Sequence, residues 1–411
     1  MDRATHPLDS LVFGSLHFSG ELSRRDMSGT PEVKGRLFFA HANDMVYSKI
    51  DARNGAIGIV PETMPRVAFS SEYPIYAVDA AVALPEYVKL LFRMSSFRER
   101  INSLISGASG RKRVEPSTLE SIEVPLPPLA TQRAIVAHWR AAQESLAATT
   151  QANDAHGAAI RRNFLEVLGL PAGTAGPTPR VFAARWSDVE AWSGKAVHLG
   201  LTRGDMRKGR YPVVKGRDCL VAVQHGCSQG PSILPTTLEV LKISAATRAE
   251  YDRNQRKFIA DSPQIRRNFD LRAGDVLMCR TNGTLAYVGM SAIVREDEPD
   301  LIFPDKLIRV RVKETMTPEF LWLVLQTPAL RSQIETAART AVGNYAIGGT
   351  DIWNFDFPLP PLAIQRQLVA EVTAVRARIA AARAAAAQLA VHTAREVEEM
   401  ILGVSPSPAG F

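Results

Sequence analysis

The stretch Pro125-Leu-Pro-Pro-Leu-Ala-Thr-Gln-Arg133 recurs almost unchanged as Pro358-Leu-Pro-Pro-Leu-Ala-Ile-Gln-Arg366, 233 residues further along the chain. We call each copy the proline phrase. A helix-like segment follows each copy. Because a period of this length is far longer than that of a solenoid repeat, each repeating unit must be a whole domain followed by a helix. The sequence therefore predicts an internal duplication of domain size.

The duplication extends upstream of the two proline phrases. The offset of 233 persists as far as the Pro-Glu pairs at 85 and 318, and further upstream it becomes 231, which indicates a small insertion. The turns Asn54-Gly55 and Asn282-Gly283 lie at different places between two apolar strands. The matching positions at the two offsets are Pro85-Glu86 with Pro318-Glu319, Gly110 with Gly343, Val114 with Ile347, Asp44 with Asp275, Ser48-Lys49 with Cys279-Arg280, and Ile57-Gly58-Ile59 with Val288-Gly289-Met290.

Each half combines short strands with one helix. Apolar runs bounded by turn residues predict strands before residue 130, at 35–40, 45–47 and 76–78, and again at 275–278 and 307–310. Apolar residues at helical spacing predict one helix from Pro85 through Ile101, and a second from Pro318 through Ile334. We therefore expect two similar α+β domains.

The segments after the proline phrases are predicted to be long helices with a heptad seam, since apolar residues recur at alternating spacings of four and three. In the first helix the pattern becomes polar at Asn153 and His156, which would fix the alignment of a helix pair. An alternative is that each helix packs separately on its own domain. The predicted seam consists of Ile135, Trp139, Ala142 and Leu146 in the first helix, and Leu368, Val372, Val375, Ile379 and Leu389 in the second.

The domain boundaries follow from these patterns. The prolines of each phrase form a stiff corner between domain and helix, because proline is tolerated at a helix start but cannot continue a strand. A segment rich in Gly and Pro then links the first helix to the second domain. The predicted parts are a first domain (1–130), a central helix (131–170), a linker (171–185), a second domain (186–363), a C-terminal helix (364–403) and a tail (404–411).

Composition favours a protein with an anionic partner. The chain has 411 residues, a formal net charge of +7 and a pI near 9.4. No apolar run reaches the roughly 18 residues that cross a bilayer, and the first residues lack the apolar core of a secretory signal, so we expect a cytoplasmic protein. The three cysteines form no Cys-x-x-Cys pair, which argues against a metal site.

Two domains, each followed by a proline phrase and a long helix, resemble the DNA specificity subunit of type I restriction-modification systems. The resemblance implies two target-recognition domains that each recognise one half of a split DNA sequence, separated by two helices that pair as an antiparallel coiled coil. It also implies the partners: double-stranded DNA, methyltransferase (modification) subunits, two of them expected, and restriction or translocase subunits.

The start of the first domain departs from this family. A Trp-containing lead-in usually begins each target-recognition domain, and Arg185-Trp-Ser-Asp188 supplies one for the second domain. Residues 1–19 contain no Trp, which predicts a first domain that is shortened or divergent at its start. This difference also supports an alternative function, that of a structural or inhibitory adaptor that binds methyltransferase subunits without recognising DNA.

DNA-binding residues are predicted in the turns that vary between the repeats and in the segments just before each proline phrase. Lys and Arg contact phosphates, whereas the forked donors of Arg and Asn recognise base edges. A solvated surface charge or a turn former is the alternative for each position. The predicted residues are Lys49, Arg53, Asn54, Arg111, Lys112 and Arg113 in the first half, and Arg280, Thr281, Asn282, Asn344 and Tyr345 in the second.

Catalytic motifs are not evident in the sequence. Gly204 to Arg210 has the two glycines of a phosphate loop but lacks its lysine and hydroxyl residues. We find neither an Asn-Pro-Pro-Tyr methylation motif nor a Gly-x-Gly-x-x-Gly dinucleotide motif. We therefore expect a subunit that is not an enzyme, binds no cofactor or metal itself, and acts with partner subunits that use S-adenosylmethionine, ATP and magnesium.

Overall fold

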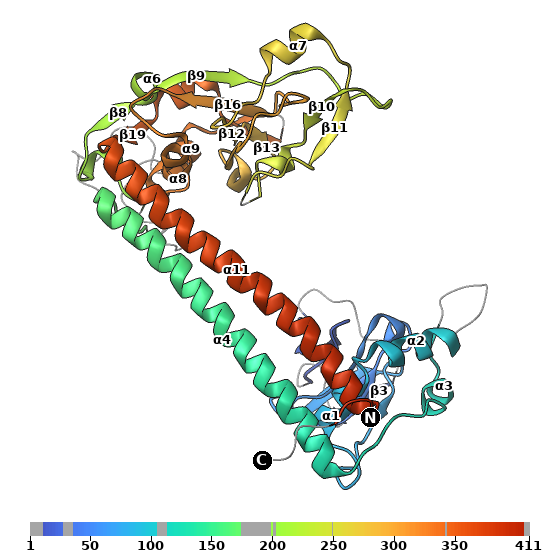
Figure 1. Cartoon of the computed structure of the whole chain (residues 1–411). Helices are drawn as coiled ribbons and strands as arrows, with labels where there is room; N and C mark the ends of the chain where they lie inside the picture. The colour runs from blue at the N-terminus through green and yellow to red at the C-terminus, as the bar shows by residue number, and fades with distance from the viewer. Residues whose placement is uncertain are drawn as a thin grey trace. The chain divides into compact units, whose positions relative to one another are not determined.

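The computed structural model describes residues 11–27, 36–104, 113–173, 199, 203–248, 250–341 and 343–406 (Figure 1). The chain divides into two compact units. The first consists of Met1–Ala152 with Ala381–Phe411, and the second of Asn153–Ala380. Each unit therefore contains one domain, half of the long helix α4 (Leu129–Leu168) and half of the long helix α11 (Leu362–Ile401).

The first domain is a mixture of short strands and short helices. Its strands are β1 (Gly14–Leu16), β2 (Leu22–Arg24), β3 (Leu37–His41), β4 (Met45–Tyr47), β5 (Ile57–Ile59), β6 (Arg66–Ser70) and β7 (Ile75–Tyr76). Its helices are the 3-10 helix η2 (Ala52–Asn54) and the α-helices α1 (Pro85–Leu91), α2 (Ser95–Leu104) and α3 (Pro116–Glu120).

The second domain has the larger set of elements. Its strands are β8 (Val213–Lys215), β9 (Leu220–His225), β10 (Leu238–Leu241), β11 (Arg256–Ile259), β12 (Val276–Cys279), β13 (Thr281–Asn282), β14 (Ser291–Ile293), β15 (Leu301–Ile302), β16 (Leu307–Val312), β17 (Arg339–Ala341), β18 (Asn344–Ala346) and β19 (Asp356–Pro358). Its helices are η4 (Met206–Lys208), α6 (Gly216–Cys219), η5 (Ile243–Ala245), α7 (Pro263–Asn268), η6 (Leu285–Tyr287), α8 (Pro318–Leu325), α9 (Pro328–Ala337) and α10 (Gly349–Asn354).

Three antiparallel strands of the same order and register lie in both domains, and in the second domain β9 adds a fourth strand beside β16. In the first domain β4 lies between β5 and β7, and Met45 pairs with Ile59 on one side and Tyr76 on the other. In the second, β12 lies between β14 and β16, and Val276 pairs with Ile293 and Val310. Because the pairing of β4 and β12 is the same on both sides, these two strands are equivalent, as the offset of 231 predicts.

The alignment of β5 with residues 288–290 is wrong. The structural equivalent of β5 is β14 (Ser291–Ile293), three residues later than the sequence offset predicts. The additional residues of the second domain lie between β12 and β14, in a segment that contains β13 and η6, whereas the shorter segment between β4 and β5 contains only η2. A short apolar segment around a glycine therefore gave a false match to the following strand.

The prediction of one helix in each domain is also wrong, because each is a pair of helices. The first pair is α1 and α2, and the second is α8 and α9. In the second domain the new helix begins at Thr327, whose hydroxyl accepts a hydrogen bond from the amide of Leu330, followed by Pro328. Threonine as N-cap followed by proline is a strong helix start, so the apolar stripe continues across a break in the backbone.

Helices α4 and α11 run antiparallel within each unit (Figure 1). In the first unit His138 of α4 lies 3.3 Å from Glu396 of α11. In the second unit Asn163 of α4 donates a 3.1 Å hydrogen bond to Glu371. These two contacts occupy equivalent positions of the repeat, because His138 corresponds to Glu371 and Asn163 to Glu396 at the offset of 233.

The seam of the helix pair departs from the strict heptad pattern. In both helices the less exposed residues follow spacings of four and three up to Asn153 and Ala386, and then a second step of four to Gly157 and Ala390. An α-helix has 3.6 residues per turn, so a strict period of 3.5 drifts away from the contact unless a step of four corrects it. The shared positions are 135, 139, 142, 146, 149, 153, 157, 160, 164 and 168 in α4, and the same numbers plus 233 in α11.

This extra step changes the assignment of Leu389. We predicted this residue on the seam, but it is 38% exposed. His156, at the equivalent position in α4, is exposed as well and does not fix an alignment. Of the remaining predicted seam residues, Ile135, Leu368 and Val372 are buried and Trp139, Ala142, Leu146, Val375 and Ile379 are partly buried.

The start of the second domain lies mostly outside the described residues. This applies to Trp186, to most of the predicted linker 171–185, and to the end of the predicted tail. Within the described part of the first domain, no strand is equivalent to β8 or β9 of the second domain. The predicted domain boundaries stay predictions.

Candidate functional site

The end of one strand is bonded in the same way in both domains. In the first domain the amide of Lys49 donates to the carbonyl of Glu72 (3.0 Å), and the carbonyl of Lys49 accepts from Val114 (2.7 Å). In the second, the amide of Arg280 donates to Lys306 (2.8 Å), and the carbonyl of Arg280 accepts from Ile347 (3.0 Å). We call these the first junction and the second junction. Each junction joins the end of a strand next to a variable turn to the segment just before a proline phrase, and DNA-binding residues were predicted in both places.

The second junction presents a partly buried arginine. Arg280 donates a 3.2 Å hydrogen bond from Nη1 to the carbonyl of Asp305. Its Nε is buried and has no hydrogen-bond partner among the described residues. It forms no ion pair with the part of the chain that the structure describes. The guanidinium therefore keeps donor capacity for an external acceptor.

Two strands bring predicted residues to the second junction. Strand β13 pairs with β18, so that Thr281 faces Ala346 and Asn282 faces Tyr345. Asn282 is partly buried, and its Oδ1 accepts a 3.0 Å hydrogen bond from the amide of Thr284. Asn344 is exposed, while Tyr345 packs against the domain core. The structure thus brings together all five residues that we predicted for this half.

His225 lies close to this group at the end of β9. Its Nε2 is 3.4 Å from the amide nitrogen of Gly349, which donates to it. Burial lowers the pKa of the imidazole, and the nearby Arg280 cation lowers it further, against the opposing effect of Asp305. His225 is therefore a neutral acceptor at neutral pH.

The first junction contains carboxylates as well as cations. The Nζ of Lys49 lies 3.1 Å from Glu115, and Arg113 forms ion pairs with Glu72 and, at 3.6 Å, with Glu115. The hydrogen bond from Arg113 to Glu72, together with the negative charge of that carboxylate, raises the pKa of the guanidinium. These four side chains form a network in which the positive and negative charges balance.

The remaining predicted residues of the first half are less involved. Arg53 and Asn54 are exposed in η2, and Asn54 donates a 3.3 Å hydrogen bond to Asp51. Arg111 and Lys112 lie outside the described residues. Sequence reasoning missed Glu72, Glu115, His225 and Lys306. Only Glu115 had a local signal, since it directly follows Val114, which aligns with Ile347.

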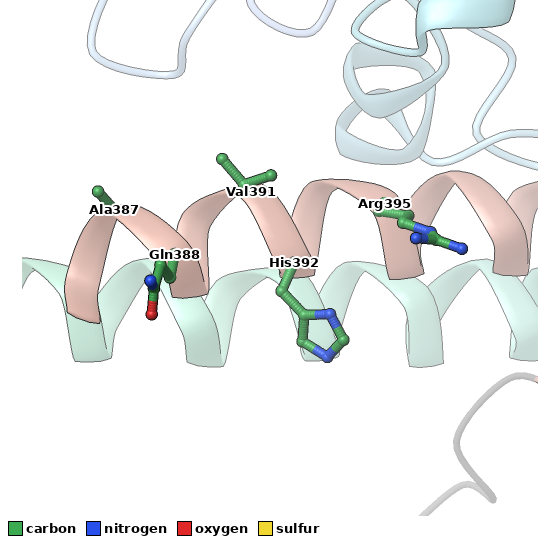
Figure 2. A pocket seen from close by; sticks show the side chains of 5 residues that line it. All are labelled: Ala387, Gln388, Val391, His392 and Arg395. Carbon is green, nitrogen blue, oxygen red and sulfur yellow. The ribbon is translucent and has the colours of Figure 1, made fainter. Parts of the chain in front are cut away.

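A separate hollow lies on the surface of α11 in the first unit. It is lined by residues on successive turns of the helix, and in the view of Figure 2 Ala387 and Val391 lie along its upper edge and Gln388 and His392 along its lower edge. Val391 is 73% exposed, and His392 lies 3.3 Å from Glu396. This hollow contains none of the predicted DNA-binding residues. We therefore assign the predicted DNA binding to the two junctions.

The described residues were also searched for reactive cysteines, metal sites and membrane-spanning helices. All three cysteines are buried, and burial raises the pKa of Cys219 and Cys279 to about 11. Within the described ranges, no three His, Cys, Asp or Glu side chains are grouped so that they could hold a metal ion. No helix among those residues is long and apolar enough to span a membrane.

Comparison with known proteins supports one family. No family model matches the chain. The chain is 25% identical over 281 residues to the type I restriction enzyme EcoKI specificity subunit of Escherichia coli K12, covering 68% of this chain and 56% of that protein. It is 25% identical over 289 residues to the StySPI specificity subunit of Salmonella potsdam, covering 70% of this chain and 58% of that protein. The chain thus spans just over half the length of these curated relatives.

A solved structure has the same fold. The similar chain comes from a structure whose description reads "Structural basis underlying complex assembly and conformational transition of the type I R-M system". It matches with a TM-score of 0.60 and 16% sequence identity, covering 97% of this chain and 93% of that one. These findings confirm the resemblance to type I restriction specificity subunits and the expected α+β fold with two similar domains and two long helices.

Proposed function

We propose that this chain is the DNA specificity subunit of a type I restriction-modification complex and recognises a DNA target in two parts. The observation that carries the proposal is the recurrence of one junction in two domains, each with side chains suited to DNA contacts. Two similar domains on one chain can each bind one half of a bipartite target. The likeness to named specificity subunits supports the same function and does not favour an adaptor without DNA recognition.

The side chains of the second junction are suited to contacts with bases and phosphates. Arg280 forms no ion pair with a carboxylate of the described residues, and arginine recognises guanine through two parallel hydrogen bonds. Asn282 and Asn344 can donate and accept at once, as recognition of adenine requires. Lys306 is exposed beside them and can contact phosphate. Together they supply both the sequence-dependent and the sequence-independent part of binding.

Catalysis in this proposal belongs to other subunits. The raised pKa of the two buried thiols leaves them protonated and unreactive at neutral pH. The partners would be double-stranded DNA, methyltransferase subunits, two of them expected, and restriction or translocase subunits. S-adenosylmethionine, ATP and magnesium would be bound by those partners.

Site-specific methylation tests this function. The purified chain alone should transfer no methyl groups, and the chain mixed with its cognate methyltransferase subunit should methylate one split motif, detected by sequencing modified bases in a random DNA library. A complex that assembles but methylates without sequence preference would support the adaptor instead. Methyl transfer by the isolated chain would contradict the assignment of catalysis to the partners.

The variants Arg280→Ala and Arg267→Ala locate the reading surface. Arg267 is exposed and lies elsewhere in the second domain, on α7, so it serves as a matched control. Arg280→Ala should change or remove specificity for one half of the motif and leave the other half intact. Unchanged specificity in a complex of normal size would show that the second junction does not recognise bases.

A further inference from the structure

One glutamine in each proline phrase joins three segments of its unit. Gln132 and Gln365 are at equivalent positions, and both are fully buried, with 0% exposure. Each lies in the first turn of its long helix, with its backbone amide donating to a proline of the phrase. A buried amide side chain is costly unless its donors and acceptor are hydrogen-bonded, so we examined the partners of each carboxamide.

The carboxamide of Gln132 makes three hydrogen bonds. Its Oε1 accepts from the amide of Leu84 at 2.9 Å, at the N-cap of α1. Its Nε2 donates to the carbonyl of Val82 at 3.0 Å and to that of Pro127 at 2.8 Å. The side chain therefore connects the long helix to the loop before α1 and to the proline phrase.

The carboxamide of Gln365 makes the same three bonds in the second unit. Its Oε1 accepts from the amide of Thr317 at 2.9 Å, at the N-cap of α8. Its Nε2 donates to the carbonyls of Thr315 and Pro360, both at 2.9 Å. All partners differ from those of Gln132 by the offset of 233. We call each of these arrangements a glutamine clamp.

The clamp requires the chemistry of an amide. One N–H donor and two carbonyl acceptors face the same point, and only a side chain with one acceptor and two donors satisfies all three. An ionised carboxylate has no donors, and an apolar side chain would leave three buried backbone groups without partners. Because both clamps lie where the domain meets its helix, they fix the angle of that corner together with the rigid prolines.

We propose that Gln132 and Gln365 are positioning residues that hold each domain at a fixed angle to its long helix, and that this rigidity makes the protein selective for the distance between the two halves of its DNA target. The inference rests on the proposed function. Neither glutamine contacts DNA in this proposal. A loosened corner lets the domain swing, so the same half-sites are accepted at neighbouring distances.

The test uses Gln132→Met and Gln365→Met, alone and together, in the assembled methyltransferase complex. The control is Gln151→Met, because Gln151 is an exposed residue of α4. The substrates are duplexes carrying the two half-sites of the wild-type motif, with the spacer shortened or lengthened by one and two base pairs. Initial methylation rates are measured on each duplex, and unfolding temperature and complex size are recorded for every variant.

The expected result is a loss of spacing selectivity without a loss of sequence selectivity. The ratio of the rate at the native spacing to the rate at the neighbouring spacings should fall roughly tenfold, because small errors of position are costly only when the parts are held rigidly. The double variant should exceed each single one, and Gln151→Met should resemble the wild type.

A second pair of variants covers the case in which the methionine variants fail to fold. Gln132→Asn and Gln365→Asn keep an uncharged amide but shorten the side chain by one methylene, so the amide cannot reach all three partners. They should give the same broadening to a smaller extent. Folded clamp variants that retain strict spacing would overturn the inference, as would a selective loss of one half-site with unchanged spacing. If the wild-type complex methylates no split motif at all, the proposed function fails instead.

Discussion

The amide and carbonyl of Lys49 in the first domain make the same backbone hydrogen bonds as those of Arg280 in the second domain, but the side chains around them differ in charge. In the first junction Lys49 and Arg113 are paired with Glu72 and Glu115. In the second, Lys306 occupies the position of Glu72, and Gly348 that of Glu115. Duplication has thus preserved the backbone frame and changed its electrostatics.

If the chain binds DNA as proposed, this difference implies two modes of DNA contact. Among the described residues, Arg280 and Lys306 of the second junction form no ion pair with a carboxylate, so they would attract phosphates directly. The cations of the first junction must leave their carboxylates before they can do so. Alternatively those carboxylates themselves accept hydrogen bonds from cytosine amino groups. In this proposal the first domain therefore contributes less to the attraction of DNA of any sequence, and its binding depends more on the bases of its own half-site.

The edges near the proline phrases differ between the domains as well. In the second domain β19 pairs with β8, and Phe357 on β19 is fully buried. In the first domain the equivalent Val124 is 39% exposed, and no described strand pairs with it. The residue just before the proline phrase is therefore part of the core in the second domain and exposed in the first.

The largest expected effect concerns this edge. Phe357→Ala should lower the free energy of unfolding of its domain by about 3 to 5 kcal/mol, because it removes a fully buried ring and leaves a cavity. Val124→Ala should change it by less than about 0.5 kcal/mol, as is usual for exposed positions. Chemical denaturation of the two variants measures both values. Equal losses would show that the first edge is covered in solution as well.

The next effect concerns DNA affinity. Arg280→Ala should weaken binding of the target duplex roughly 5- to 150-fold, the loss expected for an arginine that recognises a base. Lys49→Ala should weaken it by less than about fivefold, because its ammonium is already paired with Glu115. Fluorescence anisotropy of the assembled complex gives both dissociation constants. A loss for Lys49→Ala as large as that for Arg280→Ala would contradict the difference between the junctions.

A third experiment makes the first junction resemble the second. Glu72→Gln combined with Glu115→Gln frees Lys49 and Arg113, so affinity for random duplex DNA should rise and the slope of log affinity against log salt should steepen by about 1 to 2. Glu99→Gln, an exposed change on α2, is the control. If the double variant instead loses its specific site at an unchanged slope, the carboxylates themselves recognise bases.

Much of the architecture was predictable because it follows from repetition and periodicity. The proline phrases located both long helices to within two residues at each end, since proline starts a helix and an unbroken apolar seam continues it. The wrong predictions occurred where the pattern of apolar residues does not indicate a break in a helix or its exact pitch. The apolar stripe of α8 continues into α9 although the helix is interrupted at Thr327. Leu389 fits a strict heptad, but with 3.6 residues per turn its position has rotated away from the partner helix.

The candidate site was predictable only in part. Strand ends and variable turns indicated Lys49 and Arg280, and the sheet pairing then added Asn344 and Tyr345 as neighbours. Glu72, Lys306 and His225 could not be found in this way, because they reach the junctions through strand pairing over long sequence distances. Charge balance at each junction is therefore a property of the fold, although every charge is visible in the sequence.

The smallest expected effect concerns His225, for which the described part of the first junction has no counterpart. Burial and the Arg280 cation hold its pKa below the ordinary 6.5, so the unfolded chain binds a proton more readily than the folded domain. The resulting stability is present above about pH 6.5 and is lost as the pH falls below that value. Between pH 7.5 and 5.5, the unfolding temperature of His225→Gln should therefore fall by about 1 to 3 °C less than that of the wild type. His156→Gln, on the exposed face of α4, should fall as the wild type does, and an equal fall in all three proteins would mean that His225 is as accessible to protons in the fold as in the unfolded chain.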